Sequence, residues 1–116
     1  MEAFLTENPM EIVTIVIEDY VRTPKALINL FINAGLDKYL FPVSDMPKNG
    51  EDWLTITQMV QANRRLLVFT SDASKEAEEG IAYQWRYMIE NECKCSALLL
   101  HGYLCKQFND QDQIII

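Results

Sequence analysis

Two apolar runs stand out in the pattern of hydrophobic and polar positions, and both are typical of buried strands. Residues 11–18 read EIVTIVIE, and residues 66–71 read LLVFTS. Neither run alternates strictly between apolar and polar side chains, which favours strands that are covered on both faces, as in a parallel sheet. We therefore predict one strand over 11–18 and a second over 66–71.

Helical signals precede and follow the first strand. Residues 1–8 resemble the end of a helix, which Pro9 would stop. A second helix is predicted after Thr23, a plausible N-cap, and Pro24, which suits a first turn. Its apolar positions share one face before Gly35 ends the helix, and they are Ala26, Leu27, Leu30, Phe31 and Ala34.

The remaining segments complete an alternating order of helices and strands. Residues 36–53 contain turn-forming Pro and Gly and are predicted to be a long loop. Residues 55–63 form the next predicted helix, with Thr55 as its cap, and the aromatic cluster within 73–90 is interpreted as a further helix. Helices that alternate with strands indicate an α/β fold with a parallel sheet. Two strands are too few for a stable sheet, so the pattern predicts part of a TIM-type (β/α) barrel.

The composition is that of one globular domain, since 49% of the 116 residues are apolar and 23% are charged. The formal net charge of −7 argues against a nucleic-acid partner, because binding to a phosphate backbone needs clustered Lys and Arg. Arg64 and Arg65, which precede the second strand, are expected to be solvated or paired with acids. No apolar run reaches the roughly 18 residues of a membrane-spanning helix. A basic-then-apolar leader is lacking, so the chain is either cytosolic or begins downstream of the true start.

Polar side chains follow both predicted strands. Glu18 and Asp19 end the first strand, and Thr70, Ser71 and Asp72 end the second. In a parallel barrel the functional sites lie at the carboxyl ends of the strands, where the loops emerge. The sequence therefore predicts a site at this edge of the sheet, and the alternative is that these groups simply end strands in water.

Strand geometry distinguishes the two acids of the first strand. Successive side chains point to opposite faces, so only one of Glu18 and Asp19 can enter the barrel mouth. Glu18 shares its face with Thr14 and Val16, and the small Thr14 indicates the inward face. We therefore predict that Glu18 points into the mouth.

The last quarter of the chain holds three cysteines and the single histidine, namely Cys93, Cys95, Cys105 and His101. A zinc site formed by these four is conceivable, but the Cys-x-Cys spacing is too short for a zinc knuckle. Free, partly buried thiols are the favoured interpretation.

Four stretches closely resemble the plant proteins that contain a phosphatidylinositol-specific phospholipase C X-type domain. They are EIVTIVIEDYV (11–21), FPVSDMPKNGEDW (41–53), RLLVFTS (65–71) and EGIAYQW (79–85). Leu54 departs from the Pro that members usually have there. The resemblance covers residues 1–92, interpreted as the central portion of a barrel, and residues 93–116 are a divergent tail, expected to be helical or disordered.

The resemblance implies a TIM-type barrel of the PLC-like phosphodiesterases and hydrolysis of phosphodiester bonds in inositol lipids or related compounds. In that chemistry one histidine deprotonates the inositol 2-hydroxyl and a second protonates the leaving group, so that in-line attack gives a cyclic phosphate. Calcium in eukaryotic relatives, or an arginine in bacterial ones, offsets the charge on the phosphate. Full-length relatives are expected to be secreted or anchored at the cell surface.

Some functional positions carry over from the resemblance. Glu18 matches a carboxylate that binds calcium in the eukaryotic phospholipases, so Ca²⁺ is the implied cofactor. Thr70 and Ser71 fall where relatives place basic substrate contacts, and that basic character is missing here. No residue matches either catalytic histidine, so the chain by itself is expected to be inactive. The alternative function is a barrel remnant that serves as a binding or interaction protein, or has no function.

Overall fold

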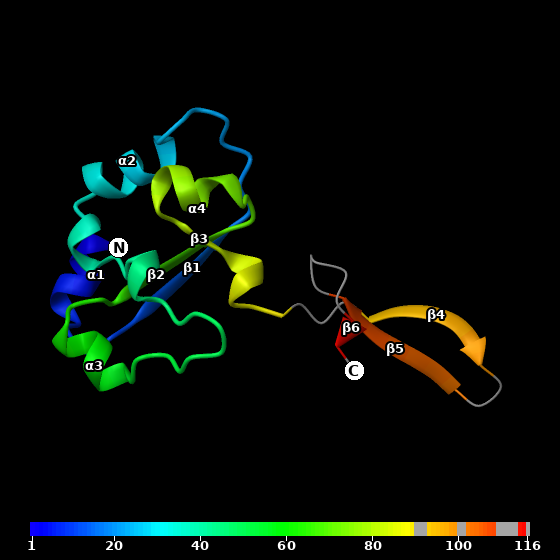
Figure 1. Ribbon diagram of the computed structural model, residues 1–116. Helices are drawn as coiled ribbons and strands as arrows, with labels where there is room; N and C mark the ends of the chain where they lie inside the picture. The colour runs from blue at the N-terminus through cyan, green and yellow to red at the C-terminus, as the bar shows by residue number, and fades with distance from the viewer. Residues whose placement is uncertain (90–92, 100–101, 109–113, 116) are drawn as a thin grey trace. The chain divides into compact units, whose positions relative to one another are not determined.

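The computed structural model describes residues 1–89, 93–99, 102–108 and 114–115, with side chains described for residues 1–89 (Figure 1). The chain divides into two compact units, Met1–Gln84 and Trp85–Ile116, and each is described by itself. The first unit contains the helices α1 (Glu2–Glu7), α2 (Ala26–Asn33), α3 (Ile56–Gln61) and α4 (Ser74–Glu79) and the strands β1 (Val13–Ile17), β2 (Leu66–Thr70) and β3 (Ala82–Tyr83).

The strands of the first unit form a parallel sheet in the order β1-β2-β3. Val13 lies opposite Leu66, and this register runs without interruption to Ile17 opposite Thr70. β3 continues the sheet on the other side of β2, with Ala82 opposite Phe69. The prediction of an α/β fold with a parallel sheet is thus confirmed, as a small three-stranded sheet with helices.

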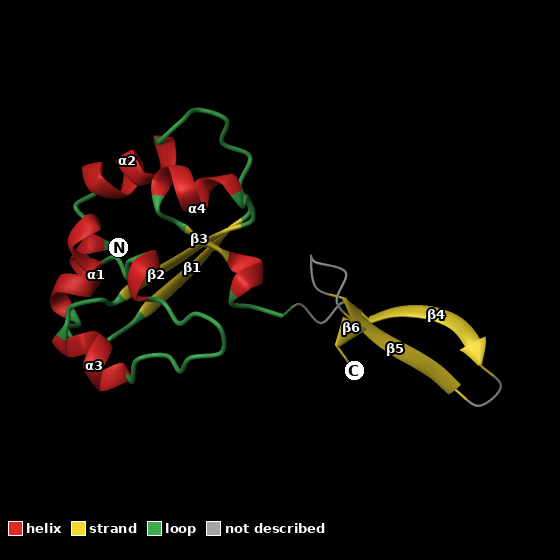
Figure 2. Cartoon of the chain, in the orientation of Figure 1, coloured by secondary structure: helices red, strands yellow, loops and turns green. Residues whose placement is uncertain are grey.

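The core lies between the sheet and helices that pack on one of its faces. Figure 2 shows α1, α2 and α4 on the same side of the strands. The buried core side chains are Leu5, Leu27, Phe31, Leu36, Tyr39, Leu66, Val68 and Ile81. The same cluster packs against alternate residues of β1, namely Val13, Ile15 and Ile17. Burial of these apolar side chains holds β1 against the helices.

The opposite face of β1 is open. Thr14 is exposed, and Val16 retains 54% of its accessible surface. β1 was expected to be covered on both faces, and the structure corrects this for the first unit. β2 differs, since all five of its residues are buried. In the sheet order, β1 is the edge strand and β2 the central one.

The helix predictions are confirmed with changes at the ends. Thr55 caps α3 in a capping box, in which its hydroxyl accepts from the Gln58 N–H and the Gln58 side chain accepts from the Thr55 N–H. Thr23 does not cap α2, which begins at Ala26 after Lys25 in a left-handed conformation. Instead, the Glu79 carboxylate accepts a hydrogen bond from the Ile28 N–H in the first turn of α2.

The prediction that the aromatic cluster within 73–90 forms a helix is wrong. The acidic stretch forms α4, and Gly80 ends it with a φ of +69°. Of the aromatic residues that follow, Tyr83 lies in β3, Trp85 in the 3₁₀ turn Gln84–Arg86 and Tyr87 in a turn after it, so none lies on an α-helix. The Tyr83 N–H donates to the Glu76 carboxylate at 2.8 Å, and this bond ties β3 to α4.

Arg65 anchors the start of β2 to the amino-terminal helix. Its buried guanidinium donates hydrogen bonds to the carbonyl oxygens of Leu5 at 2.8 Å and Asn8 at 2.9 Å. The Leu5 carbonyl would ordinarily accept from the residue four positions on, but that residue is Pro9, which has no N–H. The expectation of a solvated or acid-paired side chain is wrong for Arg65 and confirmed for Arg64, which pairs with Asp45 at 2.9 Å.

In the second unit, β4 (Cys93–Leu99) pairs antiparallel with β5 (Gly102–Phe108), which pairs with β6 (Ile114–Ile115). The described backbone of the tail is therefore extended, in place of the helix or disorder that was expected. The zinc and thiol interpretations concern His101 and cysteine side chains that lie outside the described residues. None of the described helices is long and apolar enough to cross a membrane.

Candidate functional site

A polar pocket of about 290 Å³ lies beside the carboxyl ends of β1 and β2. Its lining comes from the two loops that follow these strands and consists of Asp19, Tyr20, Val21, Arg22, Ser71, Asp72 and Ala73. The volume is close to the lower limit of the range for small-molecule sites, about 300 Å³, which suits a small ligand. The pocket lies at the edge of the sheet where the strand ends predict a site.

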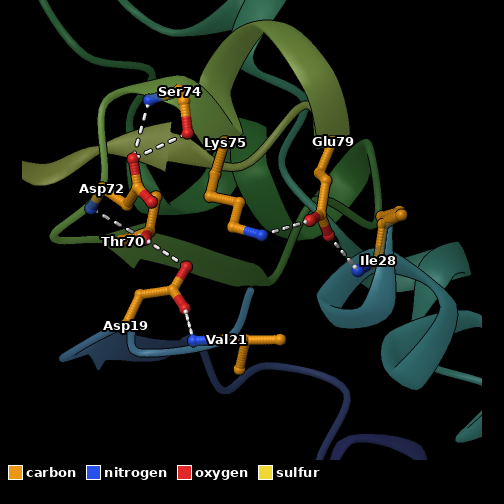
Figure 3. A network of polar contacts seen from close by, with 8 residues as sticks. All are labelled: Asp19, Val21, Ile28, Thr70, Asp72, Ser74, Lys75 and Glu79. Atoms are coloured by element: carbon orange, nitrogen blue, oxygen red, sulfur yellow. Dashed lines mark hydrogen bonds and ion pairs between the residues drawn. The ribbon is translucent and has the colours of Figure 1, made fainter. Parts of the chain in front are cut away.

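Asp19 joins the two loops. Its backbone N–H donates to the Ser71 hydroxyl oxygen at 2.8 Å, and its carboxylate accepts from the Thr70 hydroxyl at 3.0 Å. The second carboxylate oxygen accepts from the Val21 N–H at 2.8 Å, as Figure 3 shows. These bonds fix the carboxylate in one orientation at the pocket wall.

Asp72 is held in a similar way by the start of α4. One carboxylate oxygen accepts from the Ser74 hydroxyl at 2.7 Å and from the Ser74 N–H at 3.0 Å (Figure 3). These two bonds, with smaller effects from the positive charges of Lys75 and Arg22, lower the pKa of Asp72 below its usual value. Asp72 is therefore a carboxylate at neutral pH.

A buried ion pair lies behind the pocket. The Lys75 ammonium donates to the Glu79 carboxylate at 2.9 Å, and these side chains are 4% and 0% exposed. The hydrogen bond to Glu79 raises the pKa of Lys75, to which the charges of Asp19 and Asp72 also contribute. Burial opposes ionisation of Glu79, but the bonds from Lys75 and the Ile28 N–H outweigh it, so the pKa of Glu79 is lowered. Both partners are therefore charged at neutral pH.

Glu18, the predicted calcium ligand, lies on the exposed side of the strand end and outside the pocket lining. One of its carboxylate oxygens accepts from the Tyr20 hydroxyl at 2.6 Å, and this bond raises the pKa of Tyr20. Calcium takes six to eight oxygen ligands. Among the residues that the structure describes, no group of three or more His, Cys, Asp or Glu could hold a metal ion.

The two predicted substrate contacts occupy different environments. Thr70 is 0% exposed, and its hydroxyl both donates to Asp19 and accepts from the Asp72 N–H. The hydroxyl thus uses its hydrogen and one lone pair to position the two acids. Ser71 lines the pocket and accepts from Asp19, which leaves its O–H hydrogen available to a ligand.

Sequence reasoning did not single out Tyr20, Arg22 or Lys75. Tyr20 and Arg22 lie within three positions of Asp19, so their place in the loop after the strand could have identified them. Glu79 lies four positions after Lys75, a spacing at which oppositely charged side chains meet on a helix. This spacing could have predicted the ion pair.

Comparison with known proteins finds a family match over most of the chain. The family model described as PI-PLC X 1 matches residues 1–98. A PI-PLC X domain-containing protein of Arabidopsis thaliana is 73% identical over 92 residues, which are 79% of this chain and 22% of that protein. The chain thus spans about a fifth of the length of this relative, and no solved structure matches it significantly. The chain belongs to the PI-PLC X domain family.

Proposed function

We propose that this chain supplies the central part of a TIM-type barrel of the PLC-like phosphodiesterase kind. Its parallel strands are followed by helices that pack on one face of the sheet. In a (β/α) barrel the other face lines the interior, where side chains of further strands fill the space. The open face of β1, with Val16 exposed to 54%, supports this arrangement, because strands beyond residues 1–89 would cover it.

We further propose that the completed barrel is a phosphoric diester hydrolase that acts on inositol phospholipids or related phosphodiesters, at the cell surface or outside the cell. The observation that carries this proposal is the polar pocket at the carboxyl ends of β1 and β2. Asp19 and Asp72 offer oriented acceptors for substrate hydroxyls, and Ser71 offers a donor for a phosphate oxygen. Thr70 holds both acids in place.

We propose that the chain alone does not catalyse the reaction. The two-histidine chemistry of the family needs a base and an acid, and this chain contains one histidine, His101. The pocket residues then bind and orient substrate while proton transfer depends on groups from elsewhere. We likewise propose calcium binding through Glu18, with further oxygen ligands supplied when the barrel is complete.

The alternative is a non-catalytic module that uses the barrel remnant for contacts. In that function the open face of β1, with the exposed side chain of Val16, would belong to the contact surface. The two functions differ in one measurable property, which is turnover of a phosphodiester once the barrel is complete.

A chimera tests the proposal directly. The 92 aligned residues of the Arabidopsis relative are replaced by those of this chain, and release of inositol phosphate from phosphatidylinositol vesicles is measured with and without calcium. We expect turnover by the relative and by the chimera, and none by the chain alone. Ser71→Ala in the chimera should lower turnover about tenfold or more, since a donor to a charged oxygen is lost. Ser44→Ala is the matched control, because Ser44 is an exposed hydroxyl outside the pocket lining.

The outcomes separate the functions. A relative that turns over substrate while its well-folded chimera does not would overturn the assignment of this pocket. Absence of turnover in both proteins would favour the non-catalytic module. Turnover by the 116-residue chain alone would show that the proposal of inactivity is wrong.

A further inference from the structure

The loop between α2 and α3 contains an exposed turn whose central residues are Asn49 and Gly50. Asn49 is the only one of the seven asparagines in the chain that is followed by glycine. Both residues have left-handed backbone conformations, with φ values of +53° and +81°. A hydrogen bond of 3.1 Å from the Glu51 N–H to the Lys48 carbonyl oxygen closes the turn. The turn lies outside the described helices and strands, so it can open without unfolding of the first unit.

The backbone nitrogen of Gly50 is accessible to the side chain of Asn49. Within residues 1–89 neither the Gly50 N–H nor the Asn49 side-chain amide forms a hydrogen bond. There is no atom within 4 Å of the place that a Gly50 Cβ would occupy, and glycine itself has no side chain to hinder the approach. Attack of this nitrogen on the Asn49 Cγ would close a five-membered ring, and the two groups need no encounter by diffusion because they are neighbours in the chain.

Local structure opposes the same reaction at the asparagines of α1 and α2. Asn8, which follows α1, precedes Pro9, and proline has no N–H proton to lose. Asn29 and Asn33 lie in α2, whose helical backbone holds each side chain away from the nitrogen of the next residue. The N–H that follows Asn33 also donates to the Leu30 carbonyl oxygen at 3.0 Å.

Asn63 provides the closest comparison with Asn49. It is also exposed, and its φ of +56° is nearly the same. However, the N–H of the residue after Asn63 donates to the Met59 carbonyl oxygen at 2.8 Å. The Asn63 side chain accepts from the Arg65 Nε at 3.0 Å and donates to the Lys38 carbonyl oxygen at 3.4 Å. Both the nitrogen and the amide are therefore held at Asn63, and neither is held at Asn49.

We propose that Asn49 is a site of spontaneous deamidation, which converts it to a mixture of aspartate and isoaspartate. The Gly50 nitrogen loses its proton to a base of the solvent and bonds to the Asn49 Cγ, while the Cγ–Nδ2 bond breaks and ammonia leaves. Water then opens the succinimide ring. Cleavage between the ring nitrogen and Cγ gives aspartate, and cleavage between the ring nitrogen and the backbone carbonyl carbon gives isoaspartate. One water is consumed and one ammonia is released, and the reaction does not depend on the proposed function.

The products change the turn in two ways. Each adds a carboxylate at position 49, which makes the formal net charge of −7 more negative by one. That carboxylate lies two positions from Glu51, whose own carboxylate accepts from the Lys48 N–H at 3.3 Å. Isoaspartate also adds a methylene group to the main chain between these residues. We therefore expect the modified turn to lose the bond between the Glu51 N–H and the Lys48 carbonyl oxygen.

The test incubates the 116-residue chain in mildly alkaline buffer, once folded and once in guanidinium chloride, and follows each asparagine by peptide mapping with mass spectrometry. Isoaspartate is measured separately, as the transfer of a labelled methyl group from S-adenosylmethionine by a purified isoaspartyl methyltransferase. Asn49→Gln removes the site, because a glutamine side chain closes the corresponding larger ring only slowly. Asn63 is the matched control within the same chain, since it is exposed but hydrogen-bonded.

We expect Asn49 to react before any other asparagine of the folded chain. Folding should slow its reaction less than about threefold, because one exposed backbone hydrogen bond closes the turn. Folding should slow the reaction of Asn63 about tenfold or more, the protection expected from the bonds that hold its side chain and the next nitrogen. Methyl transfer to the incubated chain should be lost in Asn49→Gln.

Three results would overturn the inference. In the first, Asn49 of the folded chain reacts no faster than Asn63. In the second, Asn49 reacts in guanidinium chloride but folding protects it as strongly as it protects Asn63, which would mean that the turn holds the two groups apart. In the third, methyl transfer to Asn49→Gln equals that to the wild-type chain, so that the isoaspartate lies elsewhere.

Discussion

Replacing Arg65 by Met should strongly destabilise the first unit, because it removes donors from buried carbonyl groups. Arg65 is 4% exposed, and its guanidinium bonds to Leu5, Asn8 and Glu11 carbonyls, while its Nε donates to Asn63. Met has a similar length and keeps most of the apolar contacts of the side chain. The variant therefore isolates the polar part of the interaction.

The magnitude follows from the two shortest bonds, at 2.8 and 2.9 Å. A hydrogen bond that involves a charged group contributes about 1.5–3 kcal/mol, and such bonds are not fully additive. Water will reach part of the end of α1 in the variant and replace some donors. We therefore expect the free energy of unfolding to fall by about 3–5 kcal/mol, a large fraction of the stability of a domain of this size.

The assay is urea unfolding followed by circular dichroism and tryptophan fluorescence. Arg64→Met is the matched control, because the Arg64–Asp45 ion pair is partly exposed and such pairs contribute about 1 kcal/mol or less. Arg65→Lys should fall between the wild-type chain and Arg65→Met, since one ammonium cannot reproduce the planar fork. A loss below about 1 kcal/mol for Arg65→Met, or equal losses at both arginines, would refute the reasoning.

Three further predictions concern the helix cap, the buried ion pair and the open sheet face. Thr55→Ala should lower the free energy of unfolding by about 1 kcal/mol, and Thr55→Ser should restore most of it, as urea unfolding will show. The lowered pKa of Glu79 means that its contribution to stability is complete above its ordinary value of 4.5 and is lost as the pH falls through the lowered value. Glu79→Gln should therefore flatten the acid limb of a stability–pH profile measured by urea midpoints, and an unchanged slope would contradict the assignment. Val16→Lys should leave the stability of the isolated chain within about 0.5 kcal/mol of the wild type. In the chimera with the Arabidopsis relative it should abolish soluble folding, whereas an equal tolerance in both proteins would argue against a filled barrel interior.

The sequence predicted those features that depend on near neighbours. The apolar runs specified β1 and β2, and the capping box of α3 is contained within Thr55–Gln58. The same runs also predicted the edge of the sheet at which the pocket lies, because polar residues begin where the two strands end. Each of these signals is complete within a few residues of the chain.

The features that were missed depend on contacts between distant parts of the chain. α2 receives its cap from Glu79, which lies 51 positions after Ile28. Arg65 is satisfied by Leu5, 60 positions earlier, so its local context could not distinguish a buried anchor from a solvated charge. Asp19 lines the pocket because Thr70 and Ser71 orient it across the sheet, and these partners lie more than 50 positions away.

The bonds from Asp19 to Thr70 and Ser71 have a kinetic consequence for the pocket. They join the loop after β1 to the loop after β2, so neither loop can swing away without breaking contacts of the other. The conformational entropy of ordering this rim is then lost once, when the chain folds, and not at each encounter with a ligand. A ligand should accordingly bind without a rearrangement of the two loops. Its association rate should then depend on diffusion and electrostatic attraction more than on loop closure.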